Sequence, residues 1–259
     1  METKMQVYFL GTGTSQGIPV IGSHHSVCQS NDPKDKRLRV SVWITWDDYS
    51  VVVDCGPDFR QQMLTSGCSH LDAILFTHEH ADHTAGLDDI RPFFFKQGKD
   101  IPIYGHQRVL NNLKKRFDYI FETENRYPGA PGVQTFEVIN NQNFQIGNTE
   151  IIPINVHHGN LQVFGYRIKD FVYLTDVKSV DETEIQKMKG VKVLVVNALR
   201  EEPHHSHFSL QEALDFIHLI QPEKAYLTHI SHLMGFHEEV QQRLPHNVFL
   251  AYDNLKITL

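Results

Sequence analysis

Short apolar runs alternate with longer mixed segments along nearly the whole chain, which predicts strands followed by helices. In the first half, runs rich in β-branched and aromatic residues predict strands at 6–10, 40–46, 50–54, 73–76 and 101–104. The polar residues 47–49 separate two of these runs, so we expect a hairpin there. Helices are predicted over 57–64, from near residue 84 through residue 90, and over 106–117.

The second half repeats this alternation. Strands are predicted near 150–156, 164–168, 171–175, 193–196, 225–228 and 248–251. Helices are predicted at 181–188, 209–220 and 236–243. Because each half combines strands with outer helices, we expect an α/β protein with two stacked sheets between helical layers. A chain of 259 residues with 41% apolar residues can bury one large core, which favours a single domain over 1–259.

The composition favours a reducing, aqueous compartment. No apolar run approaches the roughly 18 residues of a membrane-spanning helix, and the amino terminus lacks the apolar core of a signal peptide. Only three cysteines occur, Cys28, Cys55 and Cys68, an odd number spread too widely for a disulfide framework. We therefore expect a cytoplasmic protein without membrane contact.

The formal charge of −7 argues against partners that are recognised by a basic surface. Binding of extended nucleic acid normally rests on clustered lysine and arginine, so a small anion held by metal is favoured instead. The 17 histidines outnumber the 16 glycines, an excess that asks for a chemical explanation. These features leave a homodimer open.

The densest group of polar donors is the run His78-Glu-His-Ala-Asp-His83, which follows the predicted strand 73–76. His78 and His80 project alike from extended backbone, whereas Asp82 and His83 can point toward a second ion at the turn into a helix. Nitrogen and oxygen donors of this kind suit zinc or manganese. A solvated polar loop is the alternative, but donors at the end of an apolar strand favour a site for two metals.

This run resembles the H-x-H-x-D-H motif of the metallo-β-lactamase superfamily, and the likeness extends along nearly the whole chain. Three further segments look most like the PhnP branch of cyclic-phosphate phosphodiesterases: Gly11-Thr-Gly-Thr-Ser-Gln-Gly17, Asp54-Cys-Gly56 and Leu227-Thr-His-Ile-Ser-His232. Ribonuclease Z is a more distant likeness. The resemblance implies a four-layer αββα sandwich and a hydrolase that uses two divalent metal ions.

The resemblance also assigns the remaining metal ligands. His158 matches the third ligand of the first metal, Asp176 matches the bridging carboxylate, and His229 completes the second metal. His157 is a rival to His158, because neighbouring residues of a strand point to opposite faces, and only the family spacing favours His158. The implied ligands are His78, His80, Asp82, His83, His158, Asp176 and His229.

Two residues outside this set have supporting roles in the resemblance. Asp54 follows an apolar run and could orient a ligand, although an aspartate that caps or turns a strand end is an equal alternative. His207 matches the family histidine that acts beside the metals, as a proton donor or as a hydrogen-bond donor to phosphoryl oxygens. A polar loop of three histidines is the alternative, and His204 or His205 could take the role instead.

The segment around Cys28 stands where PhnP-like proteins carry three cysteines of a structural zinc site. Only Cys28 and His232 match that site directly. His25 can replace one thiolate, whereas Ser23 replaces another and is a poor zinc ligand, so that His24 or water would have to contribute. A bound zinc and an ordinary polar loop both stay open, since a structural zinc normally has four firm ligands.

The donor spacing predicts metal-dependent hydrolysis, and the family likeness adds the substrate. A hydroxide that bridges two metals would attack a small, cyclic phosphodiester of a ribose or nucleotide. Asp176 would bridge the ions, Asp82 would orient the second ion, and His207 would assist the leaving oxygen. One rival is a ribonuclease Z-like nuclease that processes transfer RNA, but no glycine-rich basic insertion is visible. Another is a noncatalytic metal- or ligand-binding protein of this fold, similar to the branch involved in pyrroloquinoline quinone formation, which a loss of ligands would favour.

Overall fold

The computed structural model describes residues 4–259 and contains two seven-stranded sheets, each with parallel and antiparallel neighbours. In the order of the sheet, the first consists of β14 (Lys256–Thr258), β1 (Gln6–Gly11), β2 (Ser41–Trp46), β3 (Tyr49–Val53), β4 (Ala73–Leu75), β5 (Ile101–Gly105) and β6 (Val133–Glu137). The second consists of β13 (Val248–Leu250), β12 (Lys224–Thr228), β11 (Val193–Asn197), β10 (Phe171–Leu174), β9 (Leu161–Ile168), β8 (Thr149–His158) and β7 (Phe144–Ile146).

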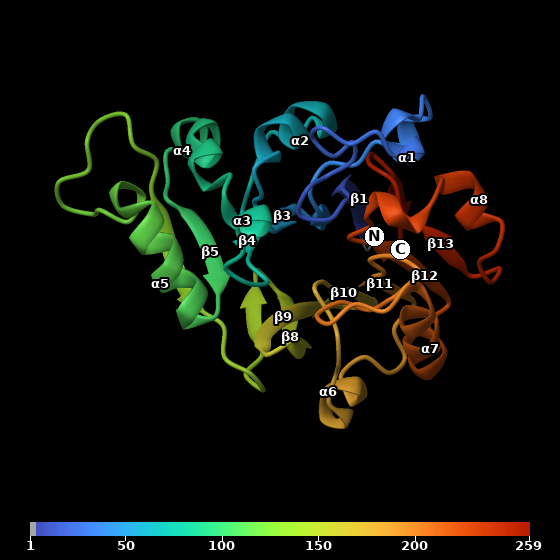
Figure 1. The fold of residues 1–259 in the computed structure, drawn as a ribbon. Helices are drawn as coiled ribbons and strands as arrows, with labels where there is room; N and C mark the ends of the chain where they lie inside the picture. The colour runs from blue at the N-terminus through green and yellow to red at the C-terminus, as the bar shows by residue number, and fades with distance from the viewer. Residues whose placement is uncertain (1–3) are drawn as a thin grey trace.

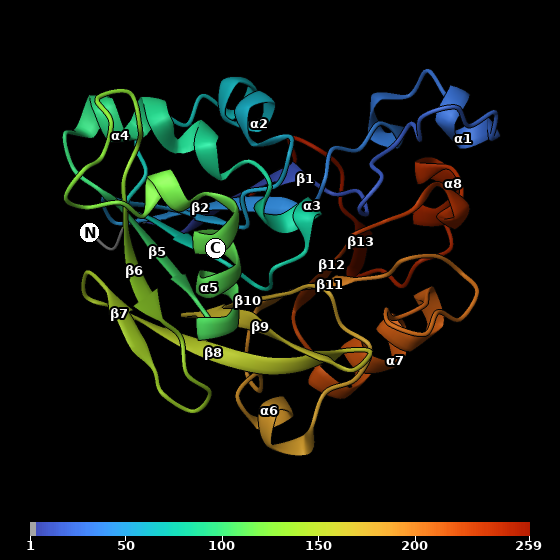
Figure 2. The same cartoon turned by 60° about the vertical axis from the view of Figure 1, so that its left-hand side comes forward.

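Helices cover the outer face of each sheet (Figure 1). The α-helices are α1 (Ser26–Gln29), α2 (Phe59–Ser66), α3 (Ala81–Thr84), α4 (Arg91–Gln97), α5 (Gln107–Arg116), α6 (Glu182–Gln186), α7 (Leu210–Ile220) and α8 (His237–Gln241). Figure 2 shows α2, α4 and α5 on the side of the first sheet and α6 and α7 on the side of the second. This arrangement is the predicted αββα sandwich, and the prediction is confirmed. Among residues 4–259, no helix is long and apolar enough to cross a membrane.

The apolar run of β3 shows how the sequence produces three layers of core. Val51 and Val53 point between the two sheets, where they join a cluster that includes Tyr166 and Tyr173 of the second sheet. Val52 points the other way, into the cluster beneath α2, α4 and α5. Because side chains alternate along a strand, a continuous apolar run marks a strand buried on both faces. A third cluster fills the space between the second sheet and α6, α7 and α8.

The prediction of one helix from near residue 84 through residue 90 was wrong, both in where the helix begins and in its continuity. The structure instead has α3 ending at Thr84, a 3₁₀ turn over Leu87–Ile90 and then α4. Gly86 lies at the interruption and packs so closely that an added Cβ would stand 2.1 Å from the carbonyl oxygen of Gly56. The chain is therefore fixed by tertiary packing at a point where helical periodicity alone favours continuation.

Candidate metal centre

Strands of both sheets end at one edge and deliver the predicted ligands there. His158 is the last residue of β8, Asp176 follows β10 by two residues, and His229 directly follows β12. The run from His78 to His83 follows β4 of the first sheet and leads through α3. Residues far apart in sequence thus converge because the carboxyl ends of neighbouring parallel strands lie at the same edge.

The predicted ligands form two adjacent groups, each of a size that could hold a metal ion. The ligand atoms within each group all lie within 4.8 Å of one another. The first group is His78, His80 and His158, and the second is Asp82, His83, Asp176 and His229. The seven residues therefore come together with the division between two metals that the family likeness implies.

Asp176 lies between the two groups. Its Oδ2 atom is 3.8 Å from His78 Nε2 and 3.9 Å from His158 Nε2 of the first group. The same oxygen is 3.4 Å from His83 Nε2, and Oδ1 is 3.2 Å from His229 Nε2 of the second group. Oδ2 thus lies near both groups and Oδ1 near the second, a placement that suits a bridging ligand.

The donor atoms of this centre fit divalent cations. The Nε2 atoms of His83 and His229 are buried among the described residues without a well-directed hydrogen bond. Buried imidazole nitrogens normally find a partner, and a metal ion is a partner that the carboxylates of Asp82 and Asp176 would share. Imidazole and carboxylate donors suit zinc or manganese.

The electrostatics of the centre also favour added positive charge. Burial opposes protonation of His83, but the carboxylates of Asp82, Asp54 and Asp176 together outweigh it and hold the pKa of this imidazole well above its ordinary value. Burial likewise opposes the ionised form of Asp176, yet the nearby His229 and His83 hold the pKa of its carboxyl well below the ordinary range. By contrast, burial lowers the pKa of His78, which keeps its nitrogen free to bind a metal.

Asp54 and Thr77 hold two of the imidazoles in the orientation that a metal would need. His83 Nδ1 donates to Asp54 Oδ2 at 2.7 Å, and Thr77 donates to the same carboxylate through N and Oγ1. Thr77 Oγ1 also lies 3.0 Å from His78 Nδ1. Partners on Nδ1 leave Nε2 of both rings facing the groups of ligands. Asp54 (φ 64°) and His229 (φ 55°) both adopt left-handed backbone, a conformation that clusters at functional sites.

The two neighbours at the end of β8 have opposite surroundings. His158 belongs to the first group and its Nδ1 donates to the carbonyl oxygen of Ser206 at 2.7 Å. His157 instead points toward the exposed carboxylate of Asp181, with 3.4 Å between Nε2 and Oδ2. The geometry therefore favours His158 over its rival.

His207 lies beside the metal groups in a buried position. Its Nε2 is 3.2 Å from Asp176 Oδ2, and it forms a third group with His158 and Asp176 that meets the same 4.8 Å limit. Its Nδ1 is 3.1 Å from both Ser206 Oγ and His204 Nδ1. Burial lowers the pKa of His207, against the opposing effect of Asp176. His207 thus lies nearer to the metal groups than its two alternatives, of which His204 contacts it and His205 packs on His204.

The candidate zinc residues lie near one another but do not form a tight group. The rings of His25 and His232 are 5.0 Å apart, whereas the Cys28 thiol faces the backbone N of Val20. Among residues 4–259, the groups of three donors within 4.8 Å do not include these residues. The structural zinc site stays a prediction.

The sequence reasoning did not find the arginines of α5 that contact the metal loop. Arg116 Nη1 donates to Thr84 Oγ1 at 2.7 Å, and Thr84 in turn donates to the carbonyl oxygen of His80. Arg108 pairs with Glu79 at 2.7 Å. The two arginines are eight residues apart and so share one face of the helix, a spacing that could have identified them.

A known protein family shares this fold and sequence. The model of a beta-lactamase superfamily domain matches residues 49–230. The chain belongs to the metallo-β-lactamase superfamily. A solved structure described as a new diphosphatase from the PhnP family has a TM-score of 0.91 and 37% identity, and covers 98% of this chain and 97% of that one. The predicted PhnP-like branch is thereby confirmed.

Two curated relatives are longer than this chain. The octanoyltransferase of Porphyromonas gingivalis is 39% identical over 254 residues, which are 97% of this chain and 51% of that protein. The ribonuclease Z of Clostridioides difficile is 27% identical over 146 residues, which are 54% of this chain and 46% of that protein. The chain therefore spans about half the length of these relatives.

Proposed function

We propose that this protein is a metal-dependent phosphodiesterase that hydrolyses a small, cyclic phosphodiester. The observation that carries the proposal is the pair of adjacent ligand groups with Asp176 between them, since two adjacent metals form the usual clamp for displacement at phosphorus. We propose zinc or manganese as the native metal. A single domain over residues 1–259 and a cytoplasmic location stay predictions.

The residues of this chain would orient the substrate and the water. Two bound divalent ions would supply a water of lowered pKa and polarise the phosphoryl oxygens. Asp82 would orient the reacting water from the second group, because its carboxylate is the most solvent-accessible acidic ligand of that group. Asp54 and Thr77 would keep the imidazoles fixed during the reaction.

His207 would protonate the leaving oxygen. Ser206 and His204 contact its Nδ1, so the ring presents Nε2 toward the metal groups, where the substrate phosphorus would lie. An alkoxide needs a proton to depart, and a general acid at this position would supply it.

Two observations favour a small substrate over transfer RNA. The net charge of −7 disfavours a long polyanion, and the protein with which this chain shares 37% identity along almost its whole length is a diphosphatase. That likeness also supports a second candidate activity, hydrolysis of the phosphoanhydride bond of a diphosphate. Both reactions place water at a phosphorus atom and need the same donor set.

A hydrolysis screen combined with elemental analysis tests the proposal. The substrates would be a nucleoside 2′,3′-cyclic phosphate, bis(4-nitrophenyl) phosphate and ADP, each with protein reconstituted in zinc or manganese. We expect two metal ions per chain and the highest kcat/KM on the cyclic phosphate. D82A should abolish hydrolysis, whereas D72N, at a carboxylate that pairs with His70, should behave as the parent. Absence of metal after reconstitution would overturn the proposal, and preference for ADP would replace the diester by the diphosphate.

A further inference from the structure

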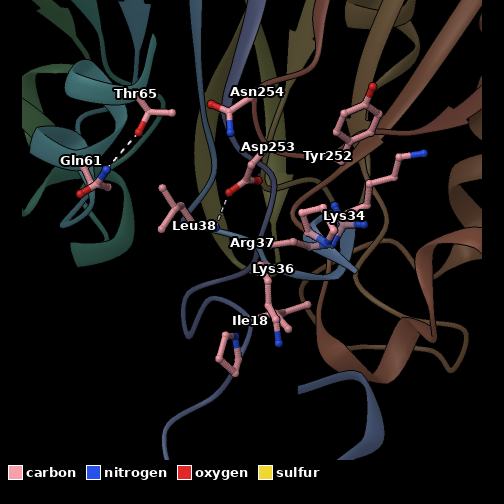
Figure 3. Close-up of a pocket in the computed structure, with 12 residues that line it drawn as sticks. Ile18, Lys34, Lys36, Arg37, Leu38, Gln61, Thr65, Tyr252, Asp253 and Asn254 are labelled. Carbon is pink, nitrogen blue, oxygen red and sulfur yellow. Dashed lines mark hydrogen bonds between the residues drawn. The ribbon is translucent and has the colours of Figure 1, made fainter. Parts of the chain in front are cut away.

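A second cavity of about 610 Å³ lies apart from the metal centre and shares none of its ligands. Figure 3 shows Gln61 and Thr65 of α2 on one side and Arg37, Tyr252 and Asp253 on the other. Cavities of this size are typical of sites for small molecules. The site therefore has room for a compact ligand.

Arg37 brings a buried positive charge to this cavity. Arg37 is only 3% exposed. Its guanidinium donates to Thr12 Oγ1 at 2.7 Å and to the carbonyl oxygen of Ala251. It also lies 3.2 Å from His237 Nδ1. Among residues 4–259, no carboxylate oxygen lies within 4.0 Å of it. The groups that contact it are thus uncharged, and the carboxylates of Asp253, Asp35 and Asp32 act on it only from beyond contact distance.

Two lysines add to this charge. Lys34 Nζ lies 5.2 Å from the centre of the Tyr252 ring, and Lys36 Nζ donates to the carbonyl oxygen of Cys28 at 3.1 Å. Within the described part of the chain, neither forms an ion pair. Asp253 is the one acidic residue in the described lining, and its oxygens already accept from Leu38 N and Thr12 Oγ1. The lining itself therefore holds three cations and one carboxylate, whereas Asp35 and Asp32, whose carboxylates also act on Arg37, lie outside it.

The rest of the lining is mainly apolar. Ile18, Pro19, Pro33 and Leu38 supply aliphatic surface, and Tyr252 supplies an aromatic ring. Apolar walls with a few charged groups are the usual composition of a site that binds an anionic molecule with an apolar body. A bare ion would leave these walls without a partner.

We propose that this cavity is a second ligand site, which binds a phosphate monoester with an aromatic body, such as a nucleoside monophosphate. The phosphate would lie in the field of Lys34, Lys36 and Arg37, because lysine and arginine are the common phosphate-binding side chains. The aromatic body would pack on the apolar wall that includes Tyr252. This site is separate from the proposed hydrolytic centre and does not depend on the activity there.

Calorimetric titration of the metal-loaded protein with AMP tests the site. We expect saturable binding that K34Q/K36Q weakens at least tenfold and Y252A at least threefold, with kcat/KM for hydrolysis unchanged in both variants. K224Q, at an exposed lysine of β12, is the matched control and should bind as the parent. Inorganic phosphate should bind at least tenfold more weakly than AMP.

Three results would overturn the proposal. The first is absence of AMP binding to the folded parent at millimolar concentration. The second is binding that D176A abolishes but K34Q/K36Q leaves intact, because AMP would then occupy only the metal centre. The third is equal affinity for AMP and inorganic phosphate, which would leave the apolar wall without a role. Lys34 and Lys36 are half-buried, so circular dichroism of K34Q/K36Q should match the parent.

Discussion

The molecule contains two buried clusters of charge with opposite imbalances. At the metal centre, the carboxylates of Asp54, Asp82 and Asp176 surround His83 so closely that they raise its pKa. At the second cavity, the hydrogen-bond partners of the buried Arg37 are uncharged, and the carboxylates of Asp253, Asp35 and Asp32 act on it only from farther away. Burial disfavours any charge that lacks a counter-ion, so the sign of each imbalance indicates the sign of the ligand. The first cluster is suited to cations and the second to an anion.

The two clusters are connected through one short segment. Thr12 Oγ1 accepts from Arg37 Nη1 and donates to Asp253 Oδ1 at the cavity. The carbonyl oxygen of Thr12 accepts from Ile230 N at 2.9 Å, and Ile230 directly follows the ligand His229. Changes at one cluster can therefore be compared with changes at the other in the same protein.

The largest expected effect concerns proton transfer at the metal centre. H207A should retain its metal content but lower kcat on a nucleoside cyclic phosphate by about 10² to 10⁴, the usual loss when a general acid is removed. The deficit should shrink on bis(4-nitrophenyl) phosphate, because nitrophenolate departs without a proton. Steady-state kinetics and elemental analysis measure both quantities.

Other outcomes for H207A separate its alternative roles. Equal losses on both substrates would indicate contact with a phosphoryl oxygen, and loss of a metal would make His207 a ligand. AMP binding at the second cavity should be unchanged. Full activity on both substrates would contradict any role and direct attention to His204.

The convergence of the candidate ligands could be predicted from sequence because these donors follow strands that apolar runs reveal. His78 and Asp176 stand just beyond β4 and β10, and the family motif supplied the pairing that strand ends alone leave open. The same reasoning located most strands. It missed β6, β7 and β14, because β6 and β14 are largely exposed and β7 has only three residues.

The second cavity could not be predicted in the same way. Its charges come from a segment without regular periodicity, where Lys34, Lys36 and Arg37 look like an ordinary solvated loop. Burial of Arg37 depends on Ala251 and His237, which are 214 and 200 residues away. Only tertiary packing reveals that this arginine is enclosed and that, within the described part of the chain, no carboxylate contacts it.

A smaller effect is expected at Asp54. D54N keeps the shape of the side chain but places an amide where His83 Nδ1 now donates to a carboxylate oxygen. An amide NH₂ there would favour the tautomer with the proton on Nε2, which blocks that nitrogen as a ligand. Affinity for the metal held by the second group should fall about 10- to 100-fold in competitive chelator titrations.

D72N is a matched control for D54N. Asp72 also contacts an imidazole, with 2.9 Å between its Oδ1 and His70 Nε2, but neither residue belongs to the ligand groups. Its metal affinity should equal that of the parent. Equal affinity in D54N and the parent would show that Asp54 only shapes the end of β3. AMP binding should be the same in all three proteins.

The smallest expected effect is a pH dependence of stability at the second cavity. Burial raises the pKa of Asp253 from 3.8 to about 6. The folded protein then holds a proton that the unfolded chain releases, so stability is fully present below 3.8 and declines as the pH rises through 6. D253N removes this decline, and its free energy of unfolding relative to the parent should improve by about 1 kcal/mol between pH 5 and pH 8.

Urea unfolding at both pH values measures this difference directly. Burial and the Arg37 charge lower the pKa of His237 to about 4, which gives an opposite slope in the same range, but His237 is present in both proteins and cancels in the comparison. D48N, at an exposed turn, should leave the pH dependence of the parent unchanged. AMP should enlarge the effect, because a bound phosphate close to Asp253 would raise the pKa of that carboxyl further above its unfolded value. The contradicting result is a difference in the free energy of unfolding between D253N and the parent that is the same at both pH values. Asp253 would then keep one protonation state, held by its hydrogen bonds with Leu38 and Thr12. The cavity would in that case carry less positive charge than its lining indicates.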